Sequence, residues 1–446
     1  MAADSNARGH HIAFATGHYP DMISYSDALH NVLAACSPLA TEQVPLAQSL
    51  GRVFAQDVIA QAHLPPFDNS AMDGFALASG GKTLAAGCEF TVVGSQAAGD
   101  GVVTSTGDAC EIMTGASLPI GLDTVVPIEQ VQVLACDGDE LPSRIRLLFD
   151  VMPGAHVRLR GQDVAHGDCI VRAGSRHDAS THMLLAALGV DLLAMHPRVP
   201  VALIATGREL VDDPQHPLAP GQIRNSNGPF LAARLAEAGA CVVHQKTVGD
   251  DAAEFTSALQ CGLDAGAKLV LSTGAVSMGR HDFVPDALRA LGATIVFHKV
   301  AIRPGKPVLF ARLPGGQLYF GLPGNPVSSA VGMRFFVEPA LRALLGQRPE
   351  QALRLPLAEP VHKKAGLQCF FKAQVGLDAA GRLQVRVLQG QESFRIRPLL
   401  SANAWAVLDA ANDVFAAGGE VGVYGLDGRG IILRAEEDGG EDDDAG

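Results

Sequence analysis

Residues 199–346 alternate short apolar runs with segments of helical apolar spacing, and this alternation is the strongest constraint on the fold. It predicts strands over 201–205, 241–247, 267–272, 294–300, 307–312 and 318–321, and helices over 229–238, 252–263, 284–291 and 327–345. Buried strands that alternate with helices are typical of a parallel, doubly wound α/β sheet. Ligands of such sheets bind where strands end and helices begin. We therefore expect an α/β domain with a ligand site along one edge of its sheet.

The segments on either side have a different pattern. Helical spacing is present over 25–36 and 174–193, and short β-rich runs occupy 90–94, 124–128, 145–149, 370–375, 383–388 and 421–424. Since 446 residues are too many for one hydrophobic core, several domains are expected. The fold class is α/β multidomain, with a central doubly wound α/β domain, a β-rich insert, a helical and β linker domain, and a small C-terminal β-barrel.

The predicted boundaries follow these changes of pattern. They are an N-terminal tail (1–22), an elongated linker domain made of two pieces (23–62 and 149–197), a β-rich inserted domain (63–148), the α/β domain (198–347), the β-barrel (348–434) and an acidic disordered tail (435–446).

Charge is concentrated at one end of the chain. The formal net charge of −13 falls to −6 without the seven acidic residues among the last eleven. A Gly-containing acidic run of this kind is typically a solvated tail. The mildly acidic body has no basic stripe, so we expect no nucleic-acid partner, and an anionic ligand needs local cations and amides.

Cysteine spacing and hydropathy limit the other classes of site. The eight cysteines include no C-x-x-C pair and no matching His spacing, so we predict buried thiols and no zinc site. The first 19 residues lack a basic region followed by an apolar core, and no apolar stretch approaches the roughly 20 residues that span a bilayer. We expect a cytoplasmic protein that does not enter membranes.

Three predicted strand-to-helix loops are rich in Gly and polar residues: ATGREL (205–210), STGAVS (272–277) and GLPGNP (321–326). Glycine lets the backbone approach an anion, and hydroxyls, amides and the N–H groups of the next helix supply donors. For any single loop a well-formed helix start is the simpler interpretation, since Asn325 can cap a helix whose first residue is Pro326. Three such loops on one sheet edge favour a pocket for a phosphate-bearing ligand. Its candidate residues are Thr206, Gly207, Ser272, Gly274, Ser277, Pro323, Gly324, Asn325 and Ser328.

The run KVAIRPGK places three cations, Lys299, Arg303 and Lys306, within eight residues. Surface lysines are common in any protein. Here, however, Lys299 ends a predicted strand, and a Pro-Gly turn fixes the direction of Arg303 and Lys306. The arrangement favours a clamp for a pyrophosphate or an oxyanion.

Carboxylates at predicted element ends supply the complementary chemistry, which is to hold a divalent metal beside a phosphate. The candidates are Glu209, Asp250, Asp251 and Asp282. An isolated loop Asp is more often a cap or a turn residue, and Asp250 and Asp251 precede a predicted helix.

Two runs in the predicted insert are also candidates for ligand contacts. The run LPPFDNSAMDGFA (64–76) is dense in turn formers, and either Asp68 or Asp73 can present a carboxylate. Thr114 lies in the run MTGA. A packed irregular loop explains both runs equally well at this point.

Six runs, in this order, resemble the MoeA/gephyrin family of molybdopterin molybdenumtransferases. They are DNSAMDGFA (68–76), IMTGA (112–116), RGQDV (160–164), STGAVSMGRHD (272–282), KVAIRPGKP (299–307) and GLPGNPVS (321–328). The resemblance extends from about residue 25 to residue 345. It implies an elongated homodimer, contacts with other proteins of molybdenum cofactor synthesis, and sites between the α/β domain of one subunit and parts of the other.

The resemblance also implies a reaction. Family members take adenylylated molybdopterin and molybdate, use Mg²⁺, and release AMP as molybdenum joins the dithiolene. By position, the catalytic set is Asp73, Glu209, Asp282, Lys299 and Lys306, the metal set is Glu209, Asp250, Asp251 and Asp282, and Thr114 and Arg303 join the loop residues above in binding substrate. Glu209 and Asp282 would hold the metal or activate an oxygen, and Lys299 and Lys306 would stabilise negative charge.

The chain departs from the family pattern at several positions. Arg208 stands where the family usually has Asp, Ala275 replaces a Gly, and Arg303 replaces a common Lys. Near the C-terminus the run QESFRIRP (391–398) replaces a Ser/Gly-rich run, Arg395 and Arg397 offer an anion contact there, and Lys372 and Ser393 are weak counterparts of family residues. Two alternatives therefore stand beside the transferase. One is a non-catalytic paralogue that binds or delivers a pterin cofactor, and the other is a nucleotide pyrophosphatase with a similar α/β domain.

Overall fold

The computed structural model describes residues 22–433, apart from residue 139 and residues 277–281. The predicted acidic tail, nearly all of the predicted N-terminal tail, and Ser277 lie outside the described residues. The chain forms two compact units, one of Gln43–Met195 and one that combines Met1–Glu42 with His196–Gly446. Within the described residues, no helix combines the length and the apolar character needed to span a bilayer.

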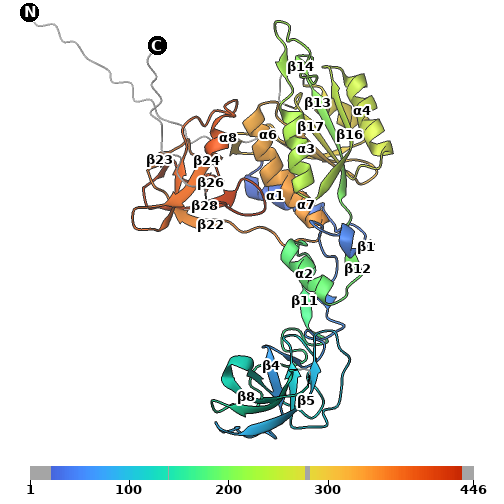
Figure 1. The fold of residues 1–446 in the computed structure, drawn as a ribbon. Helices are drawn as coiled ribbons and strands as arrows, with labels where there is room; N and C mark the ends of the chain where they lie inside the picture. Colours follow the sequence, from blue (N-terminus) through green and yellow to red (C-terminus); the bar gives the residue numbers. More distant parts are fainter. Residues whose placement is uncertain (1–21, 139, 277–281, 434–446) are drawn as a thin grey trace, which may run out of the picture. The chain divides into compact units, whose positions relative to one another are not determined.

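The second unit contains a six-stranded sheet in the order β16, β13, β17, β21, β20, β18 (Figure 1). These strands are β13 (Val199–Thr206), β16 (Ala240–Val248), β17 (Leu269–Thr273), β18 (Thr294–His298), β20 (Leu309–Arg312) and β21 (Leu318–Leu322). The four from β16 to β21 run parallel, whereas β20 is antiparallel to both of its neighbours. The sheet is mixed because only a short turn joins β20 to β21, and a turn of that length requires antiparallel strands.

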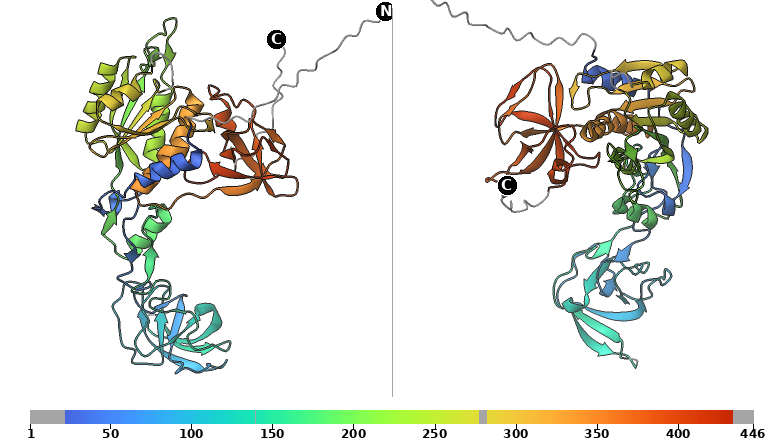
Figure 2. Two further views of the ribbon diagram at one scale, coloured as in Figure 1. Left: turned by 180° about the vertical axis from the view of Figure 1, so that it is seen from behind. Right: turned by 90° about the horizontal axis from the view of Figure 1, so that it is seen from above.

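Helices cover both faces of this sheet, as the doubly wound class requires (Figure 2). They are α3 (Asn227–Glu237), α4 (Ala252–Asp264), α5 (Val284–Ala290) and α6 (Pro326–Gly332). On the face covered by α4 and α5, Phe255 and Leu288 pack against Ile204 and Val270 of the strands. The core of the domain therefore lies between the sheet and its helices, and the strand ends are left for the loops.

The helix predicted over 327–345 has three parts. It begins as α6, continues as a π-helical turn (Met333–Val337) and ends as α7 (Glu338–Leu344), beside which α1 (Tyr25–Ala34) packs. Pro339 lies in the first turn of α7. Because proline has no N–H group, it cannot continue the α-helical hydrogen-bond ladder across this point.

The C-terminal part forms the predicted small β-barrel. Its strands are β22 (Leu353–Pro356), β24 (Gln368–Leu377), β25 (Leu383–Val387), β26 (Ala404–Leu408) and β28 (Glu420–Gly425). They pair in the order β25, β24, β26, β28, β22, and a bridge between Leu357 and Val385 joins the two ends. The smaller elements nearby are β23 (Val361–His362), β27 (Val414–Phe415) and α8 (Pro398–Ser401).

One strand of the barrel sheet comes from the predicted cationic run. The strand β19 (Ile302–Arg303) pairs in parallel with the start of β24, so that Ile302 lies opposite Gln368 and Arg303 opposite Cys369. The amide of Gln368 also donates to the carbonyl of Ala301 at 2.9 Å. The segment that carries the cations is therefore shared by the α/β domain and the barrel.

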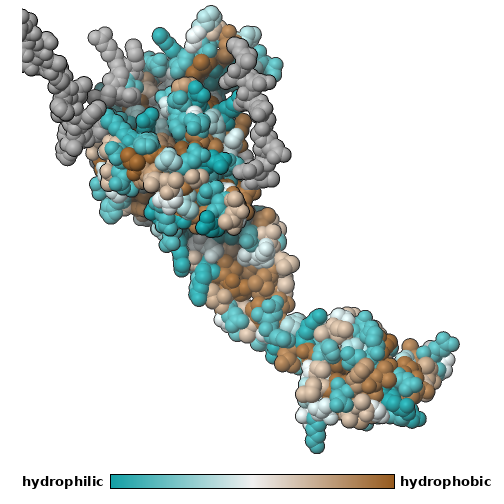
Figure 3. Space-filling view, turned by 90° about the vertical axis from the view of Figure 1, so that its left-hand side faces the viewer, coloured by the Kyte–Doolittle hydropathy of each residue, from teal (hydrophilic) through white to brown (hydrophobic). Residues whose placement is uncertain are grey.

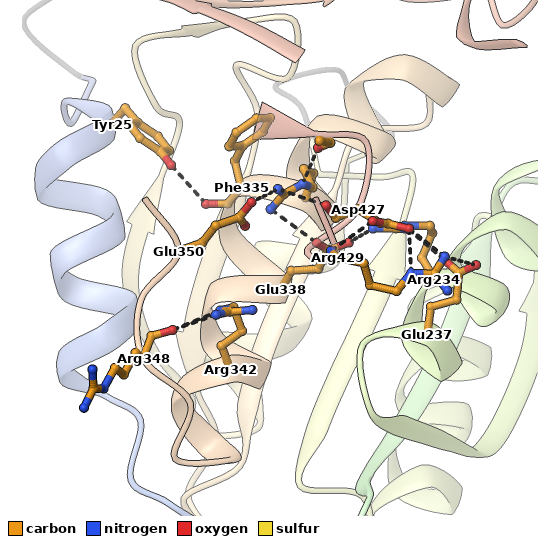
Figure 4. Close-up of polar contacts among 12 residues, drawn as sticks. Tyr25, Arg234, Glu237, Phe335, Glu338, Arg342, Arg348, Glu350, Asp427 and Arg429 are labelled. Atoms are coloured by element: carbon orange, nitrogen blue, oxygen red, sulfur yellow. Dashed lines mark hydrogen bonds and ion pairs between the residues drawn. The ribbon is translucent and has the colours of Figure 1, made fainter. Parts of the chain in front are cut away.

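A buried ion network joins the π-helical turn to the barrel (Figure 4). Arg334 donates to the carboxylate of Glu350 at 2.7 Å and to the carbonyl of Gly425 at 3.0 Å. Arg334 and Arg234 of α3 both pair with the buried carboxylate of Glu338. The network continues towards the surface through Glu237, Asp427 and Arg429.

The unit Gln43–Met195 contains a second six-stranded sheet, in the order β7, β4, β6, β5, β9, β8. Its strands are β4 (Gly74–Leu77), β5 (Glu89–Gln96), β6 (Ala109–Ile112), β7 (Thr124–Pro127), β8 (Val131–Cys136) and β9 (Pro142–Leu147). Beside it, β1 (Glu42–Pro45) pairs with β12 (Leu192–Met195), β2 (Val58–Ile59) with β11 (Cys169–Val171), and β3 (Asn69–Ser70) with β10 (Val157–Arg158). The helical stretch predicted over 174–193 is reduced to α2 (Ala179–Ala187), since Gly189 at φ 70° follows it and 192–195 form a strand.

The prediction that the cysteines are buried is wrong for most of them. All eight are free, but only Cys110 and Cys369 are buried, and Cys88, Cys136 and Cys261 are exposed. Cys88 directly precedes β5, Cys136 ends the edge strand β8, and Cys261 lies on α4. At these positions an apolar pattern in the sequence does not distinguish the inner face from the outer face.

We expect Arg334→Met to lower the free energy of unfolding by about 3–5 kcal/mol, because it leaves the buried Glu338 without one of its two cations. Urea denaturation followed by circular dichroism measures this change. Arg348→Met at an exposed position is the matched control, with an expected change within about 0.5 kcal/mol. Equal effects of the two substitutions would show that the network does not stabilise the fold.

Candidate functional site

The carboxyl ends of four parallel strands are tied together by hydrogen bonds of their loops. The hydroxyl of Thr206, at the end of β13, donates to the carbonyl of Thr273 at the end of β17 at 3.0 Å. The amide of Gly274 donates to the carbonyl of Leu322 on β21 at 3.0 Å, and that of Gly207 donates to the carbonyl of Val248 on β16 at 3.1 Å. The three predicted loops, and the loop after β16, therefore form one continuous edge, which we call the strand-end site (residues 206–209, 249–251, 274–276 and 323–325).

One glycine, Gly274, allows the first two loops to touch, and Gly324 of the third loop lies beside it. Gly274 has φ 85°, and a Cβ atom placed there would lie 2.5 Å from the carbonyl oxygen of Thr206 and 2.7 Å from its hydroxyl. A Cβ atom on Gly324 would lie 3.9 Å from the Cα atom of Gly274. A side chain at position 274 would force the first and second loops apart, so glycine is required there for steric reasons.

Ala275 follows with φ 49°, in the left-handed region. This is the conformation that glycine adopts freely and that costs other residues about 1–2 kcal/mol. The alanine therefore keeps the backbone shape that a glycine would give, at a cost in stability.

Glu209 is folded back over the first loop. A Cβ atom on Gly207 would lie 2.7 Å from each of the two carboxylate oxygens of Glu209. The side chain is half-buried, and its backbone carbonyl accepts a hydrogen bond from Ile223 at 2.8 Å. The exposed Arg208 is its neighbour. The Glu209 carboxylate thus lies directly against the backbone of the strand-end site.

The other predicted metal ligands have different surroundings. Asp251 is the N-cap of α4, because its carboxylate accepts from the amides of Ala253 at 2.8 Å and Glu254 at 2.9 Å. Asp250 beside it is exposed. Asp282 is half-buried and lies just before α5, next to residues 277–281.

No group of three or more His, Cys, Asp and Glu residues that could hold a metal is present within the described residues. Mg²⁺ does not need such a group, since it is commonly held by one or two carboxylates together with substrate phosphates and water. Glu209 and Asp282 have the oxygen donors that this ion prefers, so the residue types fit Mg²⁺ supplied with a phosphate-bearing substrate.

The cationic run packs beside the third loop. A Cβ atom on Gly305 would lie 3.4 Å from the carbonyl oxygen of Ser328 in α6, so the turn that carries Arg303 and Lys306 is close to the first turns of that helix. Both of these residues are exposed. Lys299 is half-buried and adopts φ 87°, a conformation that is rare for a residue with a side chain and is common at functional sites.

The start of α6 differs from the prediction that free helix amides would supply anion donors. Pro326 has no N–H, and the amide of Val327 donates to the carbonyl of Ser393, in the barrel, at 3.0 Å. Asn325 occupies the N-cap position, but its exposed side chain makes no capping hydrogen bond. The third loop therefore offers the Asn325 side chain to a ligand, whereas the Val327 amide is used by the fold.

Ser272 is a predicted substrate-binding residue that lies in the core. It is fully buried, and its hydroxyl forms a short hydrogen bond with the hydroxyl of Tyr319. Burial raises the pKa of Tyr319. The serine hydroxyl therefore joins two strands of the sheet.

Sequence reasoning missed four polar residues beside the site. The Asn225 amide group donates to Asp212 at 2.9 Å, and Asp212 also accepts from the hydroxyl of Thr247 at 3.1 Å. Asn227 donates to the carbonyl of Gly324 at 2.7 Å, which ties the start of α3 to the third loop. The run RNSNG (224–228) extends from the end of the short strand β15 (Ile223–Arg224), which pairs with β14 (Leu210–Val211), into the start of α3. It is a capping signal that could have identified the two asparagines.

Asp73 and Thr114 form a pair within the unit Gln43–Met195. The carboxylate of Asp73 accepts from the amide of Thr114 at 2.6 Å and from its hydroxyl at 2.8 Å. These two donors lower the pKa of Asp73 below its usual range. Asp68 has a structural contact, since it accepts from the amide of Arg160 at 2.7 Å. Asp163 donates its amide to the carbonyl of Leu64.

Three family matches cover most of the chain. The MoeA N-terminal region (domain I and II) matches residues 23–189, the probable molybdopterin binding domain matches residues 202–343, and the MoeA C-terminal region (domain IV) matches residues 354–426. The family resemblance of the six motifs is thereby confirmed, and it extends to the barrel.

Curated relatives match over nearly the whole chain. A molybdopterin molybdenumtransferase of Synechococcus elongatus is 40% identical over 91% of this chain and 100% of its own length. Molybdopterin molybdenumtransferase 2 of Mycobacterium tuberculosis is 36% identical over 89% and 96%.

A solved structure agrees with these sequence matches. The crystal structure of the molybdopterin biosynthesis MoeA protein from Pyrococcus horikoshii OT3 superimposes with a TM-score of 0.75 at 25% identity, covering 90% of this chain and 99% of the other. The α/β multidomain fold is confirmed, and the chain belongs to the MoeA family of molybdenum cofactor biosynthesis proteins.

Proposed function

We propose that this chain is a molybdopterin molybdenumtransferase that inserts molybdenum from molybdate into adenylylated molybdopterin and releases AMP. Relatives that match this chain over nearly their whole length carry that enzyme name. The observation that carries the proposal is the strand-end site, where three glycine-containing loops touch and an anchored cationic run lies beside the third. In a protein whose body is mildly acidic, this edge suits a ligand with phosphates.

The cations would act on negative charge. The ammonium group of Lys299, on a backbone held at positive φ, and that of Lys306, beside α6, would stabilise the oxyanion and the phosphates. Arg303 adds a planar fork of donors that suits a phosphate. These side chains would bind and orient the charged part of the substrate while Asn325 and the loop backbones contact the rest.

Glu209 and Asp282 would hold Mg²⁺ together with the phosphates of the substrate. When bound, the ion would neutralise charge on the pyrophosphate link that is cleaved. Because the carboxylate of Asp251 caps α4, we favour Asp250 of that pair as an additional ligand. Glu209 is held against the loop backbone, so it is already positioned towards this edge.

We also propose that the Asp73–Thr114 pair, in which Thr114 donates two hydrogen bonds to the carboxylate of Asp73, takes part in the reaction.

We further propose that the chain acts as a homodimer. Apolar side chains are exposed on the unit Gln43–Met195, including Leu141, Phe149 and Met152, and Figure 3 shows apolar patches on its surface. Exposed apolar patches of this kind commonly mark protein interfaces. Analytical ultracentrifugation would test the oligomeric state.

The non-catalytic alternative rested on Arg208 and Ala275. The backbone of Ala275 adopts a conformation in which it substitutes for a glycine, and Arg208 is exposed. Arg208 replaces a carboxylate of the family pattern, but the carboxylate of Glu209 beside it still lies against the loop backbone. The transferase is therefore the better supported function.

The central test is AMP release from adenylylated molybdopterin in the presence of molybdate and Mg²⁺. We expect Asp282→Ala to lower the rate about 100-fold, the scale of removing one charge-stabilising group from a preorganised site. Asp286→Ala is the matched control, because its side chain is 84% exposed and lies on α5 four residues later. It should retain the rate of the unmodified protein.

Two outcomes would contradict these assignments. Tight binding of the substrate without molybdate-dependent AMP release by the unmodified protein would rule out the transferase in favour of a binding protein. Equal rates for Asp282→Ala and Asp286→Ala would remove Asp282 from the reaction.

Ala275→Gly should stabilise the protein. Relief of the left-handed backbone outweighs the greater entropy of an unfolded glycine, and we expect a gain of about 0.5–1 kcal/mol. Thermal unfolding measures the change, with Ala290→Gly at the end of α5 as a control that should destabilise. A loss of stability in Ala275→Gly would show that the alanine methyl group makes a favourable contact that exceeds the backbone cost.

A further inference from the structure

A loop of the β-barrel reaches the strand-end site. This barrel loop, residues 390–397, places the carbonyl of Ser393 where it accepts a hydrogen bond from the amide of Val327 at 3.0 Å. Val327 is the second residue of α6, and the loop that precedes it supplies Gly324 and Asn325. The barrel loop therefore completes the first turn of a helix that borders the proposed substrate site.

The buried side chain of Lys372 holds the barrel loop through hydrogen bonds to its backbone. Lys372 of β24 is fully buried, and its ammonium group donates to the carbonyls of Gly390 at 2.6 Å, Arg395 at 3.0 Å and Glu392 at 3.4 Å. All three acceptors belong to the barrel loop. A buried charge is tolerated only when its hydrogen bonds are satisfied, so the ammonium group strongly favours the one loop conformation that presents these carbonyls.

A second side chain, that of Gln391, also fixes the barrel loop to β24. The amide side chain of Gln391 accepts from the amide of Lys372 at 3.0 Å, and donates to the carbonyls of Lys372 at 2.8 Å and Leu388 at 2.7 Å. The start of the loop, at Gly390 and Gln391, is thus fixed to β24 by both the side chain and the backbone of Lys372. Its tip is not packed in the same way, since Phe394, Arg395 and Arg397 are exposed.

We propose that Lys372 is a positioning residue of the substrate site: its ammonium group fixes the barrel loop against the first turn of α6 and thereby makes the barrel part of that site. The ammonium group has no direct role in the chemistry. It acts through the Ser393 carbonyl on Val327, and through the exposed guanidinium groups of Arg397 and of Arg395, which pairs with Glu392 of the same loop at 3.2 Å. Guanidinium groups suit the phosphates of an anionic substrate.

The proposal rests on the proposed function for the identity of the substrate, but its geometry can be tested without it. Lys372→Met keeps the length of the side chain and removes the three donors. Lys364→Met is the matched control, an exposed lysine of the same barrel. Gln391→Ala loosens the same loop from its other side and replaces Lys372→Met if that variant does not fold.

The first measurement is of the loop itself. Trypsin can cut after Arg395, whereas Pro398 protects the bond after Arg397. We expect cleavage at Arg395, and hydrogen exchange in the peptide that contains the Val327 amide, to become about tenfold faster in Lys372→Met, as when a fixed loop is released into local opening. Exchange in the strands of the α/β sheet should not change. Unchanged exchange at Val327 would overturn the proposal.

The second measurement is equilibrium binding of adenylylated molybdopterin. If the loop is in place in about a tenth of the molecules, the apparent affinity falls about tenfold. Lys364→Met should bind as the unmodified protein does. A released loop with unchanged affinity would show that Lys372 only stabilises the barrel, and would also overturn the proposal.

The two measurements separate this proposal from the proposed function. Failure of the unmodified protein to bind adenylylated molybdopterin overturns the proposed function and, with it, the link to this substrate. The positioning of α6 by the barrel loop is then decided by the exchange at Val327 alone.

Discussion

The site depends on a close approach of two loops that only glycine permits. Gly274 lies against the carbonyl and hydroxyl of Thr206, and Gly324 lies against Gly274 in turn. The strand ends can be joined by hydrogen bonds because no Cβ atom separates these backbones. The carboxylate of Glu209 occupies the similar space over Gly207. Steric exclusion at Gly274 thus determines how closely the first two loops of the edge approach each other.

The elements of the α/β domain could be predicted because their apolar periods are long and regular. The predicted strands and helices appear near their predicted residues, and the loops after β13, β17 and β21 meet as strand ends in a parallel arrangement must. The antiparallel β20 and the broken helix 326–344 were not predicted. Both depend on local connections, a short turn and Pro339, which a hydrophobic pattern does not register.

The individual roles of site residues were harder to infer, because one residue type serves two purposes. Asp250 and Asp251 are identical in type and adjacent, yet only Asp251 is the cap of α4. The hydroxyl of Ser272 makes it a candidate in the sequence, but in the structure this hydroxyl bonds to Tyr319 in the core. The contact between Ser393 and Val327 joins residues 66 positions apart through backbone atoms, so the side chains in the sequence carry no sign of it.

The pairing of β19 with β24 has a consequence for the way substitutions in this family are interpreted. Arg303 lies opposite Cys369 in the strand pair, and Cys369 is a buried residue of the barrel core. The Cys369 side chain is not one that would bind a charged ligand. A larger residue at that position would shift the strand pair, and the displacement would reach the neighbouring cations along the backbone. A defect in phosphate recognition can therefore originate in the packing of a domain that a map of conserved motifs would set aside as peripheral.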